Sequence, residues 1–326
     1  MPEMLYRDAL REALDEEMAR DERVFILGEE VGEYNGAYKV TRGLMDKYGA
    51  RRVMDTPITE ESFTGVGIGA ATAGLRPVVE WMTFNFAFQA MDQIVNNAAA
   101  LRYMSGGQIK IPIVFRGPNG PAEYLGTQHS HSCATWYAHT AGLKVVSAAT
   151  PYDAKGLLKS AIRDDNPVVM LEGELMYNWK GEVPDEEYLV PIGQADVKRD
   201  GKDVTVITYG RPLRIVMEAA DELEEDGVDM EVVDLRSIKP LDIATIVRSV
   251  EKTNRCVIVD EAWPMMSVAS YVAWLVSHRC FDRLDAQVEL VCSEDVPMPY
   301  NHRLELHAQP SVDRVIDAVE KVLYMQ

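Results

Sequence analysis

The stretch Arg52–Phe86, RVMDTPITEESFTGVGIGAATAGLRPVVEWMTFNF, predicts a strand, a helix and a second strand in succession. Residues 52–55 form the first strand, which Pro57 ends because proline cannot donate a ladder hydrogen bond. Thr59 is a suitable helix N-cap. Glu60 and Glu61 then fall in the first helical turn, where the helix dipole favours negative charge. The second strand covers residues 77–84 and leads into an aromatic cluster.

The helix after Glu60 is built largely of small residues. Glycine in a helix interior costs about 1 kcal/mol relative to alanine, so we expect another backbone to approach this helix closely. Its first turn would then lie near an interface, and a buried glutamate there can hold a proton near neutral pH. The competing interpretation is that both acids are solvated residues at a helix start. The small residues are Gly65, Gly67, Gly69, Ala70, Ala71, Ala73 and Gly74.

A dinucleotide site is an alternative interpretation of residues 65–70, GVGIGA, which fit the glycine fingerprint with alanine in the last place. That motif requires the glycines to turn directly from a strand into a helix. Here Pro57 and several helix-favouring residues intervene. A nucleotide-linked oxidoreductase therefore stays open as a weaker hypothesis, and it would predict direct binding of reduced nicotinamide.

Composition limits the class of protein. The chain has 326 residues, enough for two domains, and a net charge of −19, which argues against a nucleic-acid surface. Its four cysteines show neither metal spacing nor a paired framework, so we expect a reducing compartment. Residues 1–18 predict an acidic amphipathic helix rather than a signal or transit peptide. We expect a bacterial cytoplasm, or a mitochondrial matrix or plastid if a presequence has been removed.

Strands alternate with helices along the chain, which predicts an α/β protein with parallel sheets covered by helices on both faces. A helix is expected over residues 85–104. Periodicity fades from Gly173 to Arg199, and a second alternation begins at Asp203. We therefore expect a first doubly wound domain over residues 1–175, a linker over 176–199 and a second doubly wound domain over 200–326.

Three further segments contain candidate site residues. Residues 80–89 are rich in aromatics that could wall a flat heterocycle, although core packing explains most such clusters. His129 and His131 lie in a long loop, and loops of that length are commonly functional. Residues 164–167, DDNP, resemble an ordinary helix end, but their oxygens could also hold a hard cation.

Ordered motifs along nearly the whole chain resemble one family, the β subunits of the thiamin-diphosphate-dependent decarboxylating component of 2-oxo-acid dehydrogenase complexes, and most closely the pyruvate dehydrogenase type. The resemblance rests on GEEVGEYNGAYKVTRGL (28–44), DTPITEESFTGVGIGAATAGLRPVVEWMTFNFAFQAMDQIVNNAA (55–99), YMSGG (103–107), PIVFRGPNG (112–120), TQHSH (127–131), GLKVV (142–146), KGLLKSAIRDDNPVV (155–169) and DVPMPY (295–300).

The resemblance implies a pyrimidine-binding domain, a transketolase C-terminal-like domain and a set of site residues. Glu60 matches the glutamate that hydrogen-bonds the aminopyrimidine ring of thiamin diphosphate, and His129 matches a histidine that handles the lipoyl group. The pyrimidine pocket is expected to include Ile58, Phe86 and Gln89. A structural potassium site is expected at Ile113, Ala161, Ile162, Asp164 and Asn166.

The same resemblance implies partners. Thiamin enzymes hold the diphosphate through magnesium with a Gly-Asp-Gly motif, and this sequence contains none. We therefore expect an α subunit to hold most of the Mg²⁺ site in an α2β2 heterotetramer with β–β self-contact. The acidic charge suits a basic domain of the lipoyl-bearing acetyltransferase. We expect no nucleic acid or membrane as a partner.

The expected reaction is decarboxylation of pyruvate and transfer of the acetyl group to lipoamide, towards acetyl-CoA. Two alternatives remain open. One is the same chemistry on branched-chain 2-oxo acids or acetoin, since substrate choice depends in part on the α chain. The other is a non-catalytic scaffold of the same fold, against which the presence of Glu60 and His129 argues.

Overall fold

The computed structural model describes residues 2–325 and divides into two compact units. The first unit contains residues up to Asn119 and Trp136–Ile192, and the second contains Gly120–Thr135 and the chain from Gly193 onward. The domain boundary predicted from the sequence, at residue 175, places the 120–135 segment in the first domain. In the structure this segment packs within the second unit, where Thr127 Oγ1 donates to the Met298 carbonyl at 3.0 Å.

The first unit is built on a parallel sheet with strand order β6-β7-β5-β4-β2-β3. All of these strands are short and, apart from β3, strongly buried, which is typical of a parallel sheet covered on both faces. They are β2 (Val24–Gly28), β3 (Val53–Asp55), β4 (Arg76–Glu80), β5 (Val114–Asn119), β6 (Lys144–Ser147) and β7 (Val168–Gly173).

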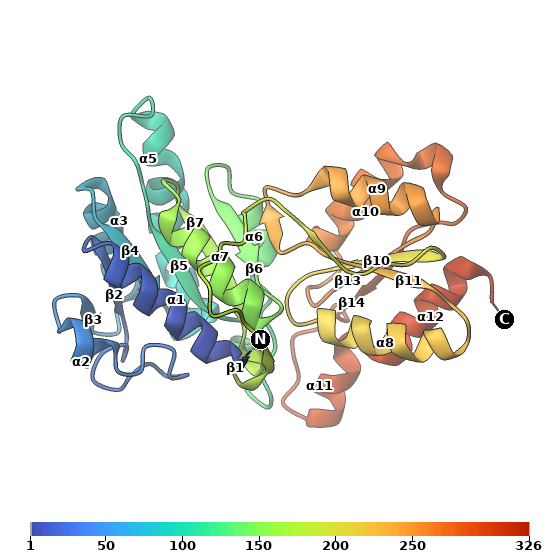
Figure 1. The fold of residues 1–326 in the computed structure, drawn as a ribbon, viewed down its shortest axis with the longest axis horizontal. Helices are drawn as coiled ribbons and strands as arrows, with labels where there is room; N and C mark the ends of the chain where they lie inside the picture. Colours follow the sequence, from blue (N-terminus) through green and yellow to red (C-terminus); the bar gives the residue numbers. More distant parts are fainter. Residues whose placement is uncertain (1, 326) are drawn as a thin grey trace. The chain divides into compact units, whose positions relative to one another are not determined.

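Alternating residues of these strands face two different helix layers. Val78 and Ile26 join the core made with α1 (Tyr6–Arg20) and α7 (Pro151–Arg163), which lie side by side (Figure 1). The next residue, Val79, faces α3 (Glu60–Thr72) instead, because a Cβ on Gly67 would lie 2.8 Å from its Cγ2 atom. The small residues of α3 therefore let the helix approach the sheet.

The other elements of the first unit are short. The helix expected over residues 85–104 is divided into several types of helix, including a π-helical segment. In the π-helical segment, the Asn97 side chain donates to the Gln93 side chain at 3.1 Å, and Gln93 lies against Gly65 of α3. The short elements are β1 (Glu3–Leu5), α2 (Leu44–Tyr48), α4 (Phe84–Ala87), η1 (Phe88–Ala90), the π-helix η2 (Gln93–Ala98), α5 (Ala99–Met104), α6 (Ala134–Ala138), η4 (Glu174–Asn178) and β8 (Lys180–Glu182).

The second unit has a mostly parallel sheet of order β14-β13-β10-β11-β9, with β9 antiparallel to β11. Helices α8 and α12 pack together on it (Figure 1). The strands of this sheet are β9 (Asp196–Arg199), β10 (Val204–Thr208), β11 (Met230–Asp234), β13 (Cys256–Asp260) and β14 (Glu289–Cys292), and the second unit also contains β12 (Ser237–Lys239), which is not part of this sheet. The helices of the second unit are η3 (Thr127–His129), α8 (Leu213–Glu225), α9 (Ile243–Thr253), α10 (Val268–Arg279), η5 (Phe281–Arg283), α11 (His302–Ala308) and α12 (Val312–Leu323).

The expected linker at 176–199 contains regular structure. β8 pairs antiparallel with β1 at the start of the chain, and β9 adds an edge strand to the second sheet. Both strands are short and largely polar, so their sequences lack the apolar alternation that predicts a strand. Among the described residues, no helix combines the length and the apolar character needed to cross a membrane.

Candidate active site

Glu60 is the first residue of α3, and its side chain is buried at 3% exposure. The next residue, Glu61, is exposed. Thr59 occupies the N-cap position, but its side chain makes no capping hydrogen bond and donates instead to the Pro57 carbonyl at 3.3 Å. One buried and one exposed carboxyl group therefore stand at the N-terminal end of α3.

Glu29 is the acidic neighbour of Glu60. It follows β2, and the pairing of Gly28 with Asp55 in β3 brings the residues after both strands to one edge of the sheet. Burial, the charge of Glu60 and a hydrogen bond between the two carboxyl groups raise the pKa of Glu29 to about 7. Its Oε1 atom has no hydrogen-bond partner within residues 2–325. The pair therefore holds an exchangeable proton at neutral pH and leaves a buried acceptor unused.

The expected pyrimidine-pocket residues lie on two segments that pack against each other. Ile58 precedes α3, whereas Phe86 and Gln89 lie on α4 and η1, which contact α3. Ile58 is 79% exposed, Gln89 is exposed and Phe86 is partly buried. The neighbouring Phe84 is fully buried and packs edge-on against Trp81. The aromatic cluster thus divides into a core part and an accessible part, and Phe86 belongs to the accessible part.

His129 ends the short helix η3 in the second unit and is partly buried. The loop around it is fixed, because the Gly120 amide donates to the His131 carbonyl at 3.0 Å. Gly126 has a φ of +74°, and a Cβ there would lie 2.6 Å from the Tyr300 ring, so only glycine fits. Burial and the charge of His129 lower the pKa of His131. The two histidines therefore interact electrostatically within an ordered loop.

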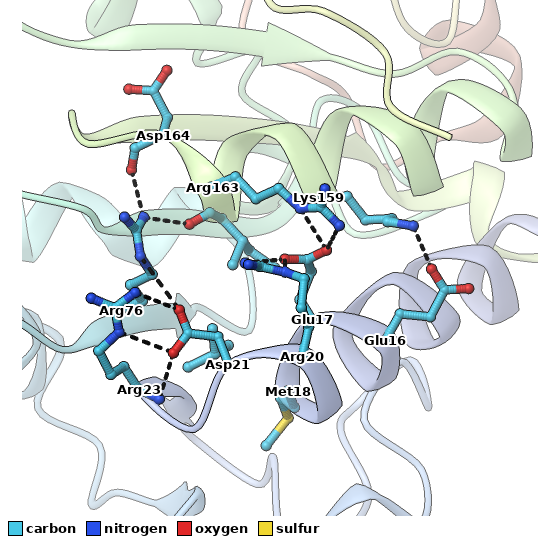
Figure 2. Close-up of polar contacts among 12 residues, drawn as sticks. Glu16, Glu17, Met18, Arg20, Asp21, Arg23, Arg76, Lys159, Arg163 and Asp164 are labelled. Atoms are coloured by element: carbon cyan, nitrogen blue, oxygen red, sulfur yellow. Dashed lines mark hydrogen bonds and ion pairs between the residues drawn. The ribbon is translucent and has the colours of Figure 1, made fainter. Parts of the chain in front are cut away.

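The expected potassium residues gather around the end of α7 and the start of β5. The carbonyls of Ile162 and Asp164 accept hydrogen bonds from Arg76 Nη1 at 2.9 and 3.0 Å (Figure 2). The Ile113 carbonyl accepts from the Val168 amide, and the Ala161 carbonyl accepts from the Asp164 amide. Asn166 Oδ1 accepts from Arg102 at 2.6 Å. These oxygens suit a hard cation, but three of them already bind guanidinium groups, two that of Arg76 and one that of Arg102.

Figure 2 also shows how the neighbouring helices are joined. Glu17 on α1 accepts two hydrogen bonds from Arg163 on α7, and Asp21 accepts two from the Arg23 guanidinium group. Asp21 also lies 3.8 Å from Arg76. Arg76 is therefore held by two acidic residues, Asp21 and, at 2.7 Å, Asp165, and by the two carbonyls.

Two family models cover the chain: the transketolase pyrimidine-binding domain matches residues 2–180, and the transketolase C-terminal domain matches residues 193–315. The mitochondrial pyruvate dehydrogenase E1 component subunit beta of Dictyostelium discoideum is 53% identical over 98% of this chain and 91% of its own length. The corresponding subunit of Rickettsia felis is 53% identical over 98% of both chains. The chain belongs to the family of pyruvate dehydrogenase E1 component β subunits.

The fold of this β-subunit family also matches a solved structure. A split-gene transketolase described as an inactive β4 tetramer superposes with a TM-score of 0.82 over 99% of both chains, at 22% sequence identity. At that identity the likeness supports the fold alone. The expected pair of transketolase-like α/β domains is thereby confirmed.

Glu29 is the candidate site residue that sequence reasoning missed. It lies in the quoted motif GEEVGEYNGAYKVTRGL, but two acids after a strand resemble an ordinary loop. The signal that could have revealed it is topological, because residues following adjacent parallel strands meet at one sheet edge. Within residues 2–325, no group of three or more histidine, cysteine, aspartate or glutamate residues is arranged to hold a metal ion.

Proposed function

We propose that the chain is the β subunit of a pyruvate dehydrogenase that decarboxylates pyruvate on thiamin diphosphate and transfers the acetyl group to lipoamide. The observation that carries this proposal is Glu60, buried at a helix start beside a second carboxyl group, in a chain similar over nearly its full length to such subunits. Two carboxyl groups that share a proton can donate it to a ring nitrogen.

The residues fit the cofactor at the pyrimidine end. Glu29 Oε1 is a buried acceptor without a partner among the described residues, and side chains that are not fully buried stand on the segments adjoining or contacting α3, namely Ile58, Phe86 and Gln89. Glu60 would hold the aminopyrimidine ring, and Phe86 would pack against it. Thiamin diphosphate supplies the carbon nucleophile and the electron sink, while these residues bind it and move a proton at its ring nitrogen.

His129 is proposed to act on the lipoyl group. Imidazole changes charge between pH 5 and 8, which suits a group that must give and take protons. The ordered loop around it supports a fixed position, and the nearby His131 disfavours double protonation of the pair.

Potassium is proposed as a structural ion bound by Ile113, Ala161, Ile162, Asp164 and Asn166, where it would share two carbonyls with Arg76. Thermal unfolding in KCl and in choline chloride of equal ionic strength tests this proposal. A bound ion stabilises only the folded state, so the melting temperature should rise with potassium concentration. Equal melting temperatures in the two salts would exclude the site.

The proposed partners follow from the expectation that this chain supplies only part of the cofactor site. Magnesium would be held mainly by an α subunit, because this sequence has no Gly-Asp-Gly motif. We propose an α2β2 heterotetramer with β–β contact that passes the acetyl group to a lipoyl-bearing acetyltransferase. We also propose a bacterial cytoplasmic or an organellar location, since relatives include bacterial and mitochondrial proteins.

The deciding experiment measures pyruvate decarboxylation with thiamin diphosphate and Mg²⁺, using the chain with and without a co-expressed α subunit. Turnover only in the mixture supports the proposal. A well-folded complex that acts on branched-chain 2-oxo acids or acetoin but not on pyruvate would reassign the substrate. Full turnover by the single chain would refute the proposal that an α subunit completes the cofactor site.

A further inference from the structure

Arg116 on β5 is a fully buried cation bound by carboxylates from both neighbouring strands. Its Nε atom donates to Glu172 on β7 at 2.6 Å, and its Nη1 atom pairs with Glu80 on β4. Both acids are themselves buried. Removing one partner of such a network leaves an uncompensated buried charge, so its members hold one another in place. None of these residues has a role in the proposed reaction.

The network continues through two stacked tyrosines into a loop. Tyr177 donates its hydroxyl to Glu172 at 2.7 Å. Its ring stacks on that of Tyr38, with centroids 4.7 Å apart and planes 21° apart. Tyr38 in turn donates to Glu174 at 2.5 Å. Tyr38 lies in the middle of residues 30–43, which we term the acid-pair loop because Glu29 directly precedes it.

The acid-pair loop is also fixed near its start. Asp55, at the end of β3, accepts hydrogen bonds from the Gly32 and Glu33 amides at 2.6 and 2.9 Å. Gly36 has a φ of +76°, and a Cβ there would lie 2.9 Å from Thr41 Oγ1. The loop is thus held at two places, one near its start, at Asp55, and one at Tyr38, which stacks on Tyr177 of the buried network.

We propose that the Arg116 network, acting through Tyr177 and Tyr38, positions the acid-pair loop and so keeps Glu29 against Glu60. These three residues are positioning residues, because none of them touches the acid pair. Only the relevance of this positioning to catalysis rests on the proposed function. The structural claim is that weaker tyrosine contacts would move Glu29 away from Glu60, and the two carboxyl groups share a proton only while they are close.

The substitution Tyr38→Phe tests this proposal, because it removes the hydrogen bond to Glu174 while keeping the stacked ring. The matched control is Tyr34→Phe, in the same loop, where the tyrosine is 55% exposed and its ring faces Lys39. Both variants of the full chain are studied by hydrogen exchange of the loop amides. The titration of Glu29 is followed by NMR with labelled glutamate, assigned with the Glu29→Gln variant.

Tyr38→Phe should speed exchange of the loop amides roughly tenfold, as expected for loss of one hydrogen bond to a charged group, and should lower the pH at which Glu29 titrates. Tyr177→Phe should change both readouts in the same direction, and Tyr34→Phe should change neither. If Glu29 titrates at the same pH in Tyr38→Phe as in the wild type, the proposal is overturned, whatever the exchange rates. Neither readout needs cofactor or partner, so failure of the proposed function would be detected separately, by full turnover of a Glu60→Gln complex.

Discussion

Glu60 and Glu61 are neighbours in sequence, yet only the first is buried at the helix start. In a complex with an α subunit, Glu60→Gln should lower turnover about 10²-fold or more, because an amide cannot exchange a proton with a ring nitrogen. Glu61→Gln is the matched control and should keep wild-type turnover. Steady-state pyruvate decarboxylation measures both. Equal activity of the two variants would remove Glu60 from the site.

Glu29 should make the stability of the chain depend on pH. Its pKa is raised from 4.5 to about 7, so the folded state binds more protons than the unfolded state between these values. Stability from this group therefore falls as pH rises through that window. Glu29→Gln should stabilise the chain at pH 8 by roughly 1–3 kcal/mol after solvent screening, with little effect at pH 4.5. Urea unfolding measures this, and the exposed Glu22→Gln is the control. A pH-independent effect would contradict the prediction.

At the scale of elements, the small residues of α3 lie on two different faces of the helix, one against the sheet and one away from it. A Cβ on Gly67 would lie 2.8 Å from Val79, whereas a Cβ on Gly69 would meet nothing within 4 Å. Gly67→Ala should therefore destabilise the chain by about 1–3 kcal/mol through overpacking. Gly69→Ala should stabilise it by up to about 1 kcal/mol through helix propensity. Chemical denaturation of the isolated chain measures both effects. The same sign in both variants would contradict this assignment of faces.

The sequence predicted elements whose cause is local and missed those whose cause is distant. The strand at 53–55 and the helix start at Glu60 follow from proline, capping and dipole rules that act within a few residues. By contrast, β8 and β9 form because partner strands lie elsewhere in the chain.

The same difference between local and distant causes applies to the residues of the candidate site. Glu60 could be found from the sequence because its motif is contiguous. Glu29 could not, because it meets Glu60 only through the pairing of β2 with β3. Likewise, the packing of residues 120–135 in the second unit depends on contacts with residues far along the chain, such as Met298.

At the scale of the whole molecule, charge is the property most relevant to assembly. The chain carries 52 acidic and 33 basic residues. A surface of one sign attracts a partner of the opposite sign from a distance, and salt screens that attraction within about 10 Å at 0.1 M. The proposed partner is a basic domain of an acetyltransferase, so electrostatic attraction should speed its association with this chain.

Association of the chain, in complex with its α subunit, with that basic domain should therefore slow markedly between 50 and 300 mM KCl. Electrostatic complementarity acts mainly on the association rate, so the dissociation rate should change less. Surface plasmon resonance measures both rates, and choline chloride at matched ionic strength separates screening from potassium binding. Salt-independent association would mean that the acidic charge serves solubility, and that docking depends on apolar contacts.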